Sequence, residues 1–118
     1  MTNKQLQALC RTWQKRLRLQ DWVITCRFAA SQRESGHCLG ESEVSTILKQ
    51  SRIRVCPLDK ADPDWMGNHD IEMTLVHELL HLHTAYVEPL FKGNDLAEKS
   101  VETAIDSIAE ALVKGYRK

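Results

Sequence analysis

Residues 74–83 read TLVHELLHLH, with three histidines and one glutamate set among leucines and a valine. On a helix, residues four apart lie about 40° apart around the axis, so His77 and His81 project from one face. Two neutral imidazoles at this spacing can bind one tetrahedral zinc ion. Glu78 lies beside that face, where a carboxylate can accept a proton from zinc-bound water without being a ligand. His83 lies about 200° from His81 and is expected to be a surface or packing residue.

The residues around these side chains are apolar and predict a helix that packs into the core: Val76, Leu79, Leu80 and Leu82. The alternative is a buried helix whose histidines bind nothing. Burial of a histidine and glutamate cluster without partners is energetically costly, and this favours the metal site. A catalytic zinc site needs a third protein ligand and leaves its fourth position to water.

Two glutamates near the C-terminus are candidates for the third ligand. Drawn as a helical wheel, residues 95–114 have an apolar arc in which Glu98 and Glu102 are the only charged residues. Glu98 follows Asp95 by three residues, as in a capping box, which gives it a structural role at the helix start. Glu102 faces the core one turn later, where an unpaired carboxylate would be costly. We therefore favour Glu102 as the ligand, and Glu98 stays the alternative.

The pattern of the whole chain predicts an α+β fold, and its 118 residues form a single domain, residues 1–118. Apolar residues at helical intervals predict three helices: Asn3–Leu19, His69–Val87 and Asp95–Lys114. Alternating apolar and β-branched residues predict three strands: Trp22–Ala29, His37–Val44 and Ser51–Cys56. The residues expected to cap the second and third helices are Asn68, Asp95 and Gly115.

The composition argues against a charged or membrane partner. Lys plus Arg and Asp plus Glu number 16 each, so no net field attracts the chain to nucleic acid or anionic lipid. The opening MTNKQLQALC lacks the apolar stretch of a signal peptide, and no apolar run approaches membrane-spanning length. We therefore expect a cytoplasmic protein. The four cysteines show no CxxC pairing and no short zinc-knuckle spacing, so they are expected to be free thiols: Cys10, Cys26, Cys38 and Cys56. The alternative is a four-cysteine structural zinc site, against which their wide spacing argues.

The two motifs together resemble those of the gluzincin group of zinc metallopeptidases. His77 to His81 reads HELLH, the HExxH motif, and Glu102 to Asp106 reads ETAID, the ExxxD motif, with Glu102 lying 21 positions beyond His81. The resemblance implies a Zn²⁺ ion bound by His77, His81 and Glu102, with Glu78 as the catalytic base. It also implies that Asp106 orients a histidine ligand. The alternative for Asp106 is an exposed carboxylate near Lys99.

The length of the chain is similar to that of minigluzincins and of small metallopeptidases carried by phages and prophages. The resemblance implies a minimal zincin-like domain: an N-terminal helix, a three-stranded sheet, an active-site helix and a glutamate helix. It implies a metalloendopeptidase acting on a peptide or protein substrate. In zincins an edge strand near the metal binds the peptide, and residues 39–44 are the candidate for that strand.

Two departures from the group leave a second function open. A chain of this length has no room for the lower subdomain that usually closes the cleft. No residue clearly matches the group's transition-state-stabilising histidine or tyrosine, and the candidates are His37, His69, Tyr86 and Tyr116. The alternative function is a zinc-stabilised binding or regulatory module with little or no peptidase activity.

Overall fold

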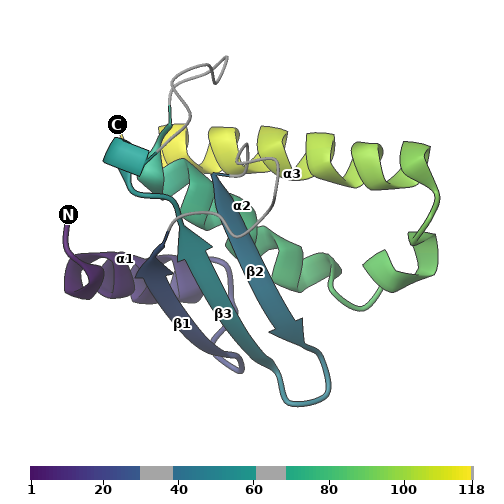
Figure 1. Ribbon diagram of the computed structural model, residues 1–118, viewed down its shortest axis with the longest axis horizontal. Helices are drawn as coiled ribbons and strands as arrows, with labels where there is room; N and C mark the ends of the chain where they lie inside the picture. The colour runs from purple at the N-terminus through teal and green to yellow at the C-terminus, as the bar shows by residue number, and fades with distance from the viewer. Residues whose placement is uncertain (30–38, 61–68, 118) are drawn as a thin grey trace.

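The computed structural model describes residues 1–29, 39–60 and 69–117 (Figure 1). It contains three α-helices: α1 (Asn3–Arg16), α2 (Ile71–Thr84) and α3 (Asp95–Tyr116). It contains three strands: β1 (Val23–Phe28), β2 (Gly40–Ser45) and β3 (Gln50–Val55). Two short 3₁₀ helices follow β3 and α2: η1 (Leu58–Lys60) and η2 (Glu88–Phe91). The α+β class expected from the sequence is confirmed, with the N-terminal helix, small sheet and C-terminal helix in the expected order.

The sheet has the order β1-β3-β2, so the last of the described strands lies in the middle. β3 is parallel to β1 and antiparallel to β2, which precedes it in a hairpin. Among the described residues, β2 pairs with β3 alone and forms an edge of the sheet. α1 packs against β1 and α2 against β2 and β3, while α3 packs mainly on α2 (Figure 1).

The core lies between one face of the sheet and the helices. Alternation places Ile24 and Cys26 of β1, and Ile53 and Val55 of β3, on this face, and all four are buried. The largest fully buried side chains of the three helices meet them there: Leu6, Cys10, Trp13, Leu75, Val76, Leu79, Leu82 and Val113. None of the helices in the described ranges is both long and apolar enough to cross a membrane.

The cysteines of the described residues lie in the interior and are not joined in disulfides, as expected. Cys10, Cys26 and Cys56 are all buried and none forms a disulfide. Cys38 lies outside the described residues.

The boundaries of α2 differ from the prediction at both ends. The helix begins at Ile71, and its N-cap is Asp70, whose carboxylate accepts a hydrogen bond of 3.0 Å from the Met73 amide. The expected cap, Asn68, lies outside the described residues. The helix ends at Thr84 instead of Val87, because the chain turns there, with the Val87 amide hydrogen-bonded to the Thr84 carbonyl, before η2 begins at Glu88.

The ends of α1 and α3 also differ. α1 stops at Arg16 instead of Leu19, and Arg18 just beyond it has a left-handed φ of 59°. The N-cap of α3 is Asn94 and not Asp95, because the Asn94 side chain accepts a hydrogen bond from the amide of Ala97. Gly115 was expected to stop α3 but lies inside it, and the helix continues to Tyr116.

Tertiary contacts explain why α3 continues past its glycine. The Tyr116 ring packs edge-on against Trp13, with centroids 5.2 Å apart. Arg117 forms a bidentate ion pair with Asp70 at 2.7 and 2.9 Å and also contacts Glu72. Glu72 in turn accepts a hydrogen bond of 2.7 Å from the Trp13 indole. The end of α3 is therefore fixed against α1 and the start of α2.

Asp70→Asn should lower the stability of the fold in a pH-dependent way. Hydrogen bonds from Arg117 hold the pKa of Asp70 below its ordinary value of 3.8. The folded pKa is the lower one, so the stabilisation is complete above the unfolded value and disappears as pH falls through the folded pKa. Asparagine keeps the helix cap, so at pH 7 the loss should be about 1 kcal/mol or less.

Urea unfolding of both proteins from neutral pH to strongly acidic pH would test this prediction. The free energies of unfolding of the two proteins should converge at the acidic end of this pH range. A difference that stayed constant across the pH range would show that ionised Asp70 contributes nothing.

Candidate metal centre

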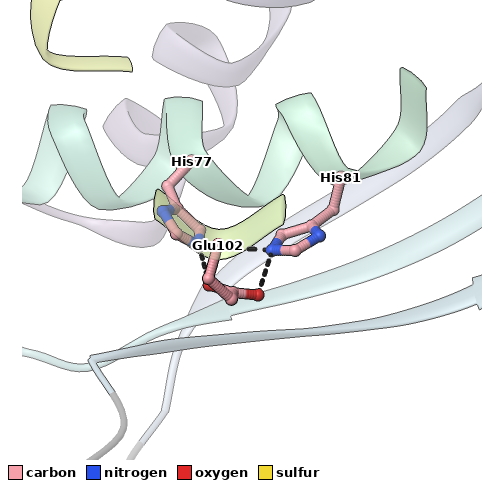
Figure 2. Close-up of side chains that lie close together, drawn as sticks. All are labelled: His77, His81 and Glu102. Carbon is pink, nitrogen blue, oxygen red and sulfur yellow. Dashed lines mark hydrogen bonds and ion pairs between the residues drawn. The ribbon is translucent and has the colours of Figure 1, made fainter. Parts of the chain in front are cut away.

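Three residues predicted as zinc ligands lie together between α2 and α3. Glu102 Oε2 is 3.0 Å from His77 Nε2, and its Oε1 is 2.9 Å from His81 Nε2. The two Nε2 atoms are themselves 3.2 Å apart. Figure 2 shows both imidazoles extending from one face of α2 towards the carboxylate. The HExxH spacing thus places both rings as expected, and α3 supplies the carboxylate across the helix interface.

The competing ligand, Glu98, has a different position. Its carboxylate accepts a hydrogen bond of 3.2 Å from the amide of Gly93, just before the helix. Among the described residues, the only group with three donor atoms placed to hold one metal ion consists of His77, His81 and Glu102. Glu98 therefore has the helix-start role expected for it, although its partner is Gly93 and not Asp95.

The outer nitrogen of each ring contacts a second carboxylate. Asp106 Oδ1 is 2.6 Å from His77 Nδ1, which is the place that the ExxxD motif implied for it. Both carboxylate oxygens of Glu88, on η2, are 3.1 Å from His81 Nδ1. Sequence reasoning missed Glu88, because its contact depends on the chain folding back after α2. The only local signal was a carboxylate seven residues after His81, before a proline.

These contacts determine where the imidazole lone pairs point. An ionised carboxylate only accepts hydrogen bonds, so each Nδ1 donates its proton to Asp106 or Glu88. In a neutral ring the Nε2 atom then carries the lone pair, and both Nε2 atoms face the oxygens of Glu102. Such a convergence of electron pairs requires a cation, which is either a metal ion or a pair of protons. Two imidazoles and one carboxylate form the His₂Glu donor set of catalytic zinc.

The electrostatics of the cluster show how strongly it attracts positive charge. Burial lowers the pKa of His81, but hydrogen bonds with Glu102 and Glu88 outweigh burial and raise the pKa to about 9. The pKa of His77 is also raised, since its carboxylate partners outweigh the effect of burial. Hydrogen bonds from both rings hold the pKa of Glu102 far below its ordinary value.

Glu78 lies next to the cluster but is not part of it. Its Oε2 is 3.9 Å from His77 Nε2, and its side chain is only 10% exposed. Burial raises the pKa of Glu78, while the two imidazoles and a hydrogen bond with Ser42 act in the opposite direction. A buried carboxylate with a raised pKa beside a metal-binding cluster is suited to accept and return a proton.

A glycine on β2 permits the strand to approach Glu78 closely. A Cβ atom at Gly40 would lie 2.7 Å from Cγ2 of Thr74 and 3.3 Å from Cγ of Glu78. The first distance is shorter than any normal carbon contact, so a side chain at position 40 would require Thr74 or the strand to shift.

The cluster opens into a cleft of about 1210 Å³ between β2 and α3. Cys56 donates a backbone hydrogen bond of 2.8 Å to Leu39, so in this antiparallel pair residues 39, 41 and 43 face β3. The backbone groups of Ser42 and Val44 therefore point away from β3, and both residues line the cleft. The predicted strand is an edge strand in the described part of the sheet, and its outer edge borders the cleft that the candidate metal ligands also line.

The other histidines and tyrosines singled out in the sequence lie elsewhere. His69 Nε2 is 2.6 Å from the Cys56 carbonyl, and the Tyr86 hydroxyl donates to the Thr46 carbonyl at 3.0 Å. Together with Tyr116, which packs on Trp13, they are absent from the cleft lining formed by the described residues. His37 lies outside the described residues. His83 is off the ligand face, with Nε2 2.7 Å from the Leu17 carbonyl at the end of α1.

Comparison with known proteins identifies no relative of this chain. No protein-family model, no curated protein and no solved structure matches it. Its function must therefore be inferred from the geometry of the cleft.

Purified protein should bind about one Zn²⁺ per chain, and His77→Ala or Glu102→Ala should each weaken binding severely. Each change removes a direct ligand, so the loss should exceed the roughly 10- to 100-fold typical of an outer partner. Elemental analysis gives the stoichiometry, and competition with a chelator gives the affinity. Glu98→Ala is the matched control and should keep full zinc. Loss of zinc in Glu98→Ala but not in Glu102→Ala would contradict the ligand set.

Proposed function

We propose that this protein is a zinc-dependent metallopeptidase of the gluzincin type, with His77, His81 and Glu102 as the zinc ligands. The observation that supports this proposal is the convergence of the two Nε2 atoms on one carboxylate, with buried Glu78 beside them. A zinc ion bound there would supply Lewis acidity towards water and towards the carbonyl of a peptide bond.

Glu78 is the general base of the proposed reaction. Its carboxylate accepts a proton from the attacking water and then donates it to the leaving amine. Both roles need a carboxyl group whose pKa lies closer to neutral pH than that of an exposed glutamate, and burial raises the pKa of Glu78 in this direction. Glu78 and Ser42 of β2 both line the cleft, so this carboxyl group lies at its wall.

The substrate of the proposed reaction is a peptide in extended conformation. β2 presents the backbone groups of Ser42 and Val44 to the cleft, where an added strand can pair with them. A peptide bound in this way runs between β2 and α3, which places its backbone next to Glu78 and the ligand cluster. An added strand binds mainly through hydrogen bonds of its backbone, so an unfolded or flexible segment of a protein is a suitable substrate.

One observation favours a second function, a zinc-stabilised binding module. In the zincin mechanism a donor stabilises the oxyanion, yet none of the described histidines and tyrosines proposed for this role lines the cleft. A module of this kind would keep the zinc ion and the peptide groove but would release no product. Measurements of zinc binding and of hydrolysis on the same preparation separate the two functions.

Glu78→Gln should leave zinc binding intact and remove hydrolysis. The amide has nearly the same shape but cannot accept the proton, and loss of a general base typically lowers kcat by about 10²- to 10⁴-fold. The assay is cleavage of a broad library of quenched fluorescent peptides by zinc-loaded protein. No cleavage by the parent protein would favour the binding module, and equal cleavage by both proteins would rule out Glu78 as the base.

Val44→Pro should impair peptide binding without disturbing the sheet. The Val44 amide points away from β3, so proline there costs no hydrogen bond of the sheet but removes a donor for an added strand. Loss of one such bond should lower kcat/KM by about 3- to 10-fold. Val44→Ala keeps the amide and is the control, and both variants should bind zinc normally. Equal kcat/KM values for the two variants would argue against strand addition at β2.

A further inference from the structure

Glu88 is held in place from two directions. Its two carboxylate oxygens are equidistant from His81 Nδ1, and one of them also accepts a hydrogen bond of 2.5 Å from the Thr84 hydroxyl. The side chain is 32% exposed and the His81 side chain 13% exposed, so the contact between them is partly shielded from water. A charge-assisted hydrogen bond in such surroundings is stronger than the same bond at the surface.

The turn after α2 brings Glu88 back to the helix. The amide of Val87 donates to the Thr84 carbonyl at 3.0 Å, and the amide of Leu90 donates to the Val87 carbonyl at 3.0 Å. Pro89 follows Glu88 at the start of η2 and restricts the backbone there. Local backbone geometry therefore determines the position of Glu88, so the carboxylate does not reach His81 as a loose surface side chain.

We propose that Glu88 is a positioning residue of the metal centre, which holds the His81 ring in the tautomer and orientation that aim Nε2 at Glu102. This inference rests on the proposed zinc site. Without an acceptor at Nδ1, the imidazole could move its proton to Nε2 or rotate about its outer torsion. Either change would withdraw the lone pair from the place where His77 and Glu102 converge.

Glu88 and Asp106 divide this task between the two rings. Asp106 comes from α3 and contacts His77, while Glu88 comes from η2 and contacts His81. The Asp106 side chain is 73% exposed, whereas that of Glu88 is 32% exposed. Glu88 belongs to no recognised motif, yet it is the better shielded of the two carboxylates. We expect Glu88 to contribute at least as much to metal affinity as Asp106 does.

A purely structural role explains Glu88 less well. A carboxylate close to the C-terminus of a helix faces the negative end of the helix dipole, which is unfavourable. Glu88 lies four residues beyond the end of α2, so as a cap for this helix it has the wrong charge. The ion pair with His81 is favourable and offsets this unfavourable position of the carboxylate.

The test is the metal affinity of Glu88→Ala and Glu88→Gln, measured with Zn²⁺ by chelator competition. Loss of an outer carboxylate should weaken binding by about 10- to 100-fold in the alanine variant. The glutamine variant retains an oxygen acceptor without the charge, so its loss should be smaller. The control is Glu110→Gln, which removes an exposed carboxylate paired with Lys114 and should bind zinc like the parent.

Two further measurements separate positioning from folding. Thermal unfolding of the metal-free variants reports stability, and the visible absorption of the Co²⁺-loaded proteins reports ligand geometry. Weaker zinc binding and an altered Co²⁺ spectrum in a folded Glu88→Gln protein would support the proposal, even if Glu88→Ala failed to fold. Parent-like affinity and spectrum in Glu88→Gln and in a folded Glu88→Ala would overturn it. A parent protein that binds no zinc would overturn the proposed function and this inference together.

Discussion

The contact between the Glu102 carboxylate and the two imidazoles of α2 is the interaction on which the arrangement of the site depends. It joins α3 to α2 at distances of 2.9 and 3.0 Å, which only one register of the two helices permits. That register is fixed again some 15 residues later, where Arg117 meets Asp70 at the start of α2. Two polar contacts, one at the site and one far from it, therefore define how the helices pack.

Carboxylates surround the two rings, and each has a separate task. Every ring nitrogen of His77 and His81 has a carboxylate partner: the inner ones share Glu102, and the outer ones contact Asp106 and Glu88. Glu78 is left out of this pairing and stays buried beside it. A carboxylate that neither binds the metal nor orients a ligand can change its protonation during a reaction without releasing the metal.

The sequence contained enough information for the centre of this site but not for its surroundings. Helical periodicity alone placed His77 and His81 together, and the wheel of the last helix favoured Glu102 over Glu98. The position of the two histidines follows from local helix geometry. The wheel also brought Glu102 to them, but the burial expected for its carboxylate is wrong, because the side chain lines the cleft and is 54% exposed. Glu88 was missed because its contact depends on a 3₁₀ turn that returns the chain to α2, and no short-range rule encodes such a turn.

The difference between local geometry and contacts distant in sequence also explains the errors at the helix ends. Gly115 is a reasonable stop signal, but packing of Tyr116 on Trp13 stabilises another turn of helix beyond it. Asp70 was expected in the first turn of α2 and not at its N-cap, and a pairing with Arg117 47 positions away could not be foreseen. Propensity specifies where a helix can end, and contacts distant in sequence decide where it does end. Here the contacts of Tyr116 and Arg117 also orient α3 on its neighbours, and this orientation helps to bring Glu102 to the two histidines.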